Sequence, residues 1–191
     1  MKKLLHLKHW QLFLLLISGP VIVFFLTFVM IASGSFISWM LMMVVQLLAF
    51  ATMSVFFFWI YTLAINLNRK LPDAMPMNIK KFKVLWAIPL LYIVLMYTFM
   101  IFAFPSITKG NEFNPSIILL IIPLHFFSMF CIFYCLYFVA KSLKAVELQR
   151  KVSSGDYIGE FFTLWFFPIG IWFIQPRVNK LFAEDNVDVN Y

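Results

Sequence analysis

The sequence predicts an all-α integral membrane protein: a four-helix transmembrane bundle followed by a short C-terminal re-entrant or interfacial helical hairpin. Three observations support this prediction. The composition is too apolar for a soluble domain, four apolar runs are long enough to cross a bilayer, and a fifth, aromatic run is interrupted by proline and glycine. The alternative is five transmembrane helices.

The composition places much of the chain in lipid. Of its 191 residues, 63% are hydrophobic and 12% are charged, whereas soluble domains average about 45–50% and about 25%. A chain of this length cannot bury so much apolar side chain in water, so lipid must be part of its solvent. We therefore expect residues 1–191 to form a single membrane domain without a substantial soluble part.

An apolar stretch of about 20 residues spans the ~30 Å hydrocarbon core as a helix. Such stretches predict transmembrane helices at residues 10–31, 36–67, 84–104 and 117–140. The first is expected to be an uncleaved helix, because its apolar run is longer than that of a signal peptide. The second is longer than a bilayer needs, so it is expected to tilt or to end in a cytosolic extension.

Polar segments follow the fourth run. Residues 141–156 are predicted to form a cytosolic helix and a linker, and Asp156 is expected to cap the element that comes next. Glu160 lies close in sequence to Arg150 and Lys151, which predicts a solvated charge contact. Residues 183–191 form an acidic tail.

Basic residues flank the apolar runs mainly on one side, since the two connections on the opposite side contain only Lys109 between them. They precede the first run, separate the second from the third and follow the fourth: Lys2, Lys3, Lys8, Arg69, Lys70, Lys80, Lys81, Lys83, Lys141, Lys144, Arg150 and Lys151. The positive-inside rule then places the N-terminus and these segments in the cytoplasm. Abundant Lys, Phe, Ile and Asn are typical of an AT-rich bacterial genome, so we expect a bacterial inner (cytoplasmic) membrane.

The same placement of charge bears on partners. Although the net charge is +7, the cations sit where anionic headgroups lie and not along one nucleic-acid-binding face. The expected partners are the lipid bilayer and either a membrane protein or further copies of this chain. No nucleic acid is expected.

The run at residues 157–182 contains "FFTLWFFPIGIWFIQPRVNKLF". Its apolar part, from Phe161 to Ile174, is about 21 Å long as a helix and too short for the hydrocarbon core. Pro168 predicts a break near residues 163–167, and Gly170 permits a turn or close helix packing.

Arg177 and Lys180 follow this run, and the positive-inside rule favours keeping both in the cytoplasm. Residues 157–182 are therefore predicted to enter and leave on one side, with the C-terminus cytoplasmic. Pro168, Gly170 and Pro176 then mark a break or packing site that other parts of the protein must cover.

Few residues are candidates for chemistry. His125 is the only ionisable residue well inside a predicted span, which makes it a candidate ligand or proton relay, although a neutral histidine also serves as a structural hydrogen-bonding group. Cys131 and Cys135 point away from it around the helix, so no metal site is expected. No second deep histidine exists for a haem, and no cofactor is expected. Arg69, Lys70, Arg177 and Lys180 are interfacial candidates for binding an anion or a lipid headgroup.

The sequence contains no nucleophile elbow, zinc-protease motif, phosphate-binding loop or dinucleotide fingerprint. We therefore expect a small multi-pass membrane protein without catalytic activity. It would act as an accessory, assembly, immunity or regulatory subunit by helix packing with a membrane partner. The alternatives are a homo-oligomeric transport or channel module and a lipid-acting membrane enzyme.

Overall fold

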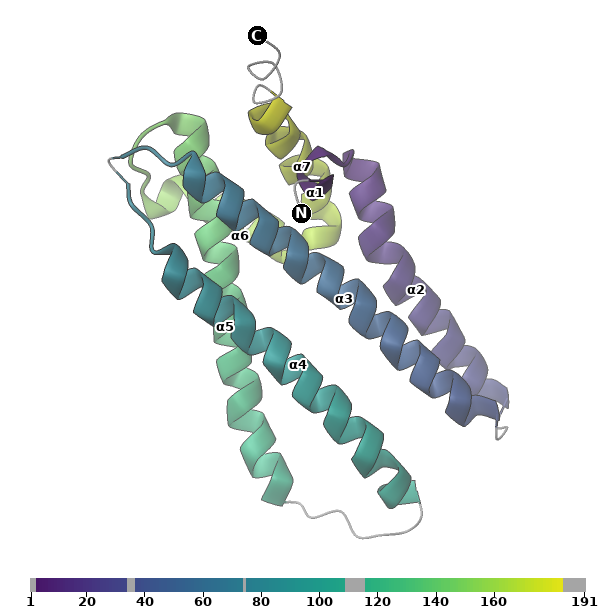
Figure 1. Ribbon diagram of the computed structural model, residues 1–191. Helices are drawn as coiled ribbons and strands as arrows, with labels where there is room; N and C mark the ends of the chain where they lie inside the picture. Colours follow the sequence, from purple (N-terminus) through teal and green to yellow (C-terminus); the bar gives the residue numbers. More distant parts are fainter. Residues whose placement is uncertain (1–2, 34–36, 74, 109–115, 184–191) are drawn as a thin grey trace.

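The computed structural model describes residues 3–33, 37–73, 75–108 and 116–183, and these ranges contain helices and short connections but no strand (Figure 1). The helices are α1 (Lys3–His6), α2 (His9–Ser33), α3 (Ile37–Arg69), α4 (Ile79–Thr108), α5 (Ser116–Leu148), α6 (Ser154–Trp165) and α7 (Phe167–Ala183). The predicted acidic tail lies outside the described residues except for Ala183.

Four of these helices are long and apolar enough to cross a membrane. The qualifying segments are His9–Val29 in α2, Leu47–Arg69 in α3, Ile79–Ile101 in α4 and Ser116–Leu148 in α5. Each overlaps one predicted run. Helix α5 continues without interruption to Leu148, so the predicted fourth span and the predicted cytosolic helix after it are one helix of 33 residues. At about 50 Å, that helix is longer than the hydrocarbon core.

The core is concentrated at one end of the molecule. The helices lie close together where α1 and α7 are, and they spread apart toward the opposite end (Figure 1). Fully buried Leu12, Trp59, Phe82, Leu143 and Ile174 belong to one core cluster at this end. By contrast, no side chain is buried in residues 20–29 of α2, 91–101 of α4 or 116–127 of α5.

Helix α6 begins with a capping arrangement in which Ser153, not Asp156, is the N-cap residue. Asp156 lies three positions later, and its Oδ2 accepts hydrogen bonds from the backbone N–H and the hydroxyl of Ser153 at 2.8 and 3.0 Å. The backbone bond from Ser153, together with the bonds from the Arg150 guanidinium and the Ser153 hydroxyl, lowers the pKa of Asp156 to about 2. The carboxylate stays charged and stabilises the start of the helix.

Helices α6 and α7 form a hairpin that breaks at Phe166, inside the predicted interval. The Phe166 N–H donates to the carbonyl of Phe162 at 2.9 Å, and the N–H groups of Ile169 and Gly170 donate to the carbonyl of Phe166. Pro168 lies in the first turn of α7, where a backbone donor is not needed. Helix α6 packs on α5 and α7 packs on α1 and α2, but the break itself is open, since Phe166 and Ile169 are 61% and 65% exposed.

Candidate functional site

Gly170 brings the two arms of the hairpin into direct contact. A Cβ atom on Gly170 would lie only 1.8 Å from the backbone oxygen of Thr163 in α6. Glycine is therefore required by close approach of two backbones, whereas the sequence left both a turn and close packing open for this position. Pro176 lies inside α7 and is exposed, so its ring occupies the outer side of the helix.

A buried amide joins α7 to two other elements. Gln175 is fully buried, and its Oε1 accepts a hydrogen bond from Trp59 Nε1 of α3 at 3.0 Å. Its Nε2 lies 3.0–3.3 Å from the carbonyl oxygens of Leu4, Leu5 and Leu7 and 3.0 Å from Asn179 Oδ1, and its two N–H groups are shared among these four acceptors. The last carbonyls of a short helix such as α1 have no partner within the helix, and Gln175 supplies one.

Replacing Gln175 with leucine is expected to lower the unfolding temperature and to make the N-terminal turn more sensitive to protease. The indole N–H of Trp59 and the α1 carbonyls would lose their partner, at about 1–3 kcal/mol for each buried group left unpaired. The measurement is thermal unfolding in mild detergent with mapping of the first cleavage sites. A matched control is Gln11→Leu, because Gln11 makes one exposed bond to the Lys8 N–H. Equal effects of the two changes would contradict the prediction.

An ionic cluster ties the ends of α5, α6 and α7 together. Arg177 donates to both carboxylate oxygens of Glu147, through Nε at 2.6 Å and through Nη2, and Nη2 also lies 2.8 Å from Glu160 Oε1. Lys144 Nζ lies 3.0 Å from the same oxygen of Glu160. Two cations thus face two carboxylates. The bidentate geometry with Glu147 is the strongest form of this interaction.

Burial and ion pairing act in opposite directions within this cluster. Desolvation raises the pKa of Glu160, but hydrogen bonds from Arg177 and Lys144 outweigh it and hold that pKa below its usual value. Hydrogen bonds to Glu147 raise the pKa of Arg177, with a further contribution from Glu160. Glu160 and Arg177 are therefore both charged at neutral pH. Glu160 pairs with Lys144 and Arg177 and not with its sequence neighbours, since Arg150 instead pairs with Asp156.

The four predicted headgroup residues have different surroundings. Arg177 is held by two carboxylates, so its geometry favours a structural role over contact with an anion. Lys70 donates to the Leu181 carbonyl at 2.7 Å and lies 4.7 Å from the centre of the Phe182 ring, where it caps α7. Arg69 and Lys180 are exposed. A surface pocket of about 390 Å³ is lined by Glu147, Arg177, Lys180 and Leu181. The pocket therefore contains the Glu147 carboxylate as well as the cations of Arg177 and Lys180.

His125 is exposed on the face of α5 that is turned toward α4. Its Nδ1 shares a hydrogen bond of 3.0 Å with the hydroxyl of Tyr92, and the two rings are 5.6 Å apart in an edge contact. Cys131 and Cys135 are buried free thiols. Among the described residues, no three His, Cys, Asp or Glu side chains are grouped so as to hold a metal ion.

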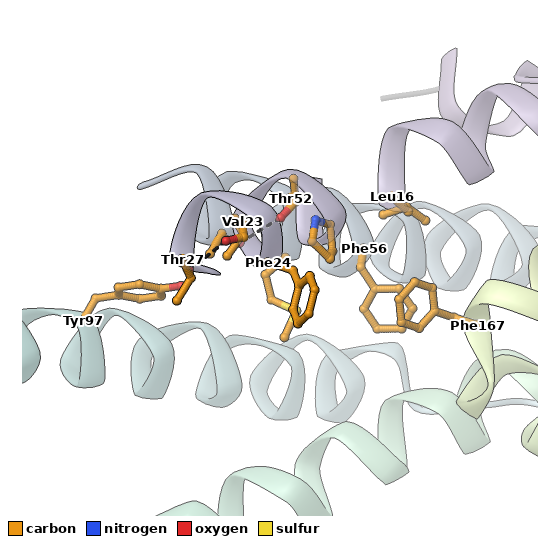
Figure 2. A pocket seen from close by; sticks show the side chains of 11 residues that line it. Leu16, Val23, Phe24, Thr27, Thr52, Phe56, Tyr97 and Phe167 are labelled. Carbon is orange, nitrogen blue, oxygen red and sulfur yellow. Dashed lines mark hydrogen bonds between the residues drawn. The ribbon is translucent and has the colours of Figure 1, made fainter. Parts of the chain in front are cut away.

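A lateral groove of about 430 Å³ lies between α2, α3, α4 and the tip of α7 (Figure 2). Its lining is Leu16, Pro20, Val23, Phe24, Thr27, Ala49, Thr52, Met53, Phe56, Tyr97 and Phe167. The hydroxyls of Thr27 and Thr52 donate to carbonyls of their own helices, at 2.7 Å to Val23 and 3.0 Å to Ala49. Figure 2 shows Tyr97 directed toward Thr27 at one end. The lining offers no acid–base pair, and its chemistry suits a hydrocarbon chain.

Comparison of the chain with protein families, curated proteins and solved structures finds no match. The class of protein is therefore defined by the structure alone. The described residues form an all-helical protein with four helices long and apolar enough to span a membrane.

Proposed function

We propose that this chain is a non-catalytic subunit of the bacterial inner membrane that acts by packing its helices against a membrane protein partner. The observation that carries the proposal is the uneven burial along the bundle. Side chains at the basic end form a closed core, whereas residues 20–29, 91–101 and 116–127 bury none. Helices that spread apart leave apolar sides for a neighbour to cover, and helix packing in membranes depends on such contacts.

The Tyr92–His125 pair supports the same proposal. His125 is exposed among apolar side chains such as Phe126 and Leu120, which are 60% and 73% exposed. Only Nδ1 has a hydrogen-bond partner within the described residues. An incompletely bonded histidine facing acyl chains is unfavourable, so a polar group of a partner helix is the natural complement for Nε2.

The proposed topology places both termini in the cytoplasm, with the α6–α7 hairpin re-entering the same side. Arg177 lies eleven residues after Phe166, so the hairpin tip lies about 16 Å from the level of this arginine, roughly half of the hydrocarbon core. The tip exposes Trp165, Phe166 and Phe173, which suits contact with acyl chains. A C-terminal green fluorescent protein fusion is expected to fluoresce. An active alkaline phosphatase fusion would favour five transmembrane helices.

Gentle detergent purification of a tagged chain from its native host, followed by intact-complex mass spectrometry, tests the proposed function. The expected result is a second membrane protein at fixed stoichiometry. His125→Phe is expected to reduce its recovery, whereas His6→Phe, a matched change at an exposed position of the basic end, is expected to leave it unchanged. A bare monomer overturns the proposal, and a homo-oligomer alone favours a transport or channel module.

A further inference from the structure

We propose that a lysine–tyrosine patch at the basic end of the molecule binds the phosphate of an anionic phospholipid in the surrounding bilayer. The patch consists of Lys81 from α4, Tyr134, Tyr137 and Lys141 from α5, and Tyr157 from α6. It does not include the four cations that the sequence suggested for this role. Binding of a phospholipid at this patch also does not depend on the proposed membrane protein partner.

The five side chains are in continuous contact across three helices. Lys81 Nζ lies 5.1 Å from the centre of the Tyr134 ring. Lys141 Nζ lies 5.3 Å and 5.9 Å from the centres of the Tyr137 and Tyr157 rings. The rings link these positions, with centres 5.9 Å apart for Tyr134 and Tyr137 and 5.6 Å apart for Tyr137 and Tyr157. Cation–π contacts of this kind hold both ammonium groups in place.

The charge of the patch is not neutralised by acids of the described chain. Lys144 and Arg177 pair with Glu147 and Glu160, and Arg150 pairs with Asp156. In the same described ranges, neither lysine of the patch has a carboxylate within ion-pair distance. This separates an ionic cluster that holds the helices together from a set of cations that remains available to an anion.

The patch also retains hydrogen-bond donors. Lys141 donates to the Tyr137 hydroxyl at 2.9 Å, so Tyr137 accepts one bond and keeps its own O–H to donate. An ammonium group has three N–H donors, and Lys141 uses only one in this contact. Burial raises the pKa of Tyr157, and a side-chain hydrogen bond with Tyr137 raises it further, so the Tyr157 hydroxyl stays protonated within the patch. Phosphate oxygens are acceptors that match ammonium and phenol donors.

The surroundings favour a phospholipid over free phosphate. Lys81 is close to the first residue of α4, at the end where basic residues gather, and tyrosine and lysine are both typical of the headgroup level. Val84 lies one turn from Lys81 and Phe130 one turn from Tyr134, and these side chains are 63% and 70% exposed. Residues one turn apart share a helix face. A ligand with a phosphate and an acyl chain would contact both parts of this surface.

The test compares two double variants with the same loss of charge. Lys81→Gln with Lys141→Gln removes the patch cations. Lys80→Gln with Lys151→Gln removes two exposed lysines, neither of which contacts a tyrosine within the described part of the chain. Binding of phosphatidylglycerol and of phosphatidylcholine to each purified chain is titrated by native mass spectrometry. Since one basic residue contributes about five-fold to binding at an anionic membrane surface, the patch variant should bind phosphatidylglycerol roughly 25-fold more weakly.

The control variant is expected to keep its preference for phosphatidylglycerol. Equal losses in both variants would overturn the proposal, because binding would then follow net charge alone, and so would an unchanged patch variant. Competition by inorganic phosphate at the lipid's own concentration would instead identify a free-phosphate site. Tyr137→Phe is a second measurement that retains the ring but removes one donor. It should weaken binding without changing the unfolding temperature.

Discussion

Replacing Gly170 with alanine is expected to force the α6–α7 hairpin apart and to give the largest loss of stability of any single methyl addition in this segment. The new Cβ would lie 1.8 Å from the Thr163 oxygen and 2.7 Å from its carbonyl carbon. These are backbone atoms, so no change of rotamer relieves the overlap. Overpacking costs about 1–3 kcal/mol in ordinary cores, and a clash between two backbones belongs at the upper end.

The displacement would spread through α7. Ile171 and Ile174 are fully buried, and Gln175 is bonded to α1 and α3, so a shift of the helix disturbs each of these contacts. The measurement is the unfolding temperature in mild detergent, together with protease sensitivity of the segment between α5 and α6. We expect a lower unfolding temperature and faster cleavage.

Gly159 supplies the matched control within the same hairpin. It lies in α6 with nothing within 4 Å of the position a Cβ would take. Alanine favours a helix by about 1 kcal/mol relative to glycine, so Gly159→Ala is expected to be neutral or stabilising. If Gly170→Ala behaved like this control, the two arms would not be in direct contact.

The long helices were predictable because each apolar run must satisfy its own backbone groups when lipid is the solvent. This requirement acts on one segment at a time and is therefore visible in sequence. The break in the aromatic run was predictable for a similar reason, since Pro168 changes the local backbone whatever surrounds it. A cytosolic helix was expected after the fourth run, within residues 141–156, and α5 continues to Leu148. Hydropathy falls after Ala140, but a helix can pass from lipid to water without ending.

The ionic cluster could not be predicted, because its partners are far apart in sequence. Glu160 was expected to contact Arg150 or Lys151, which are its neighbours along the chain. The folded hairpin brings Arg177 back beside α6, seventeen residues away, and it turns Glu160 toward Lys144. For Gln175, the available signal was an amide in an otherwise apolar run. Its acceptors on α1 become evident only once α7 packs against the N-terminal turn.

Replacing Arg177 with methionine is expected to destabilise the protein through an uncompensated carboxylate. The side chain of Glu160 is 9% exposed, and without Arg177 only Lys144 would remain beside it. Removing one partner of a buried ion pair costs about 3–5 kcal/mol. Because the side chain of Arg177 is 33% exposed, water weakens the pair, and we expect about 2–3 kcal/mol.

The control is Arg150→Met at the exposed Arg150–Asp156 pair, where the arginine side chain is 56% exposed. Exposed pairs contribute at most about 1 kcal/mol. The measurement is again thermal unfolding in mild detergent at pH 7. Similar losses of stability in Arg177→Met and Arg150→Met would show that burial of Glu160 does not increase the cost of removing its partner. A partial recovery on combining Arg177→Met with Glu160→Gln would identify Glu160 as the group left uncompensated.

The pH dependence separates an electrostatic cause from simple loss of packing. In the native protein the pKa of Glu160 is lowered, so its stabilising contribution is present above the unfolded-state value of about 4.3 and is lost as pH falls through the lower folded value. In Arg177→Met, the hydrogen bond from Arg177 no longer offsets the desolvation of Glu160, so the pKa of Glu160 should rise. Protonation of Glu160 then removes the uncompensated charge, so the variant regains stability as pH falls from 7 toward 5. The stability of the native protein changes little over the same range. The difference in unfolding temperature between the native protein and Arg177→Met should therefore become smaller on acidification. A constant difference would show that the loss of stability comes from lost packing of the arginine side chain.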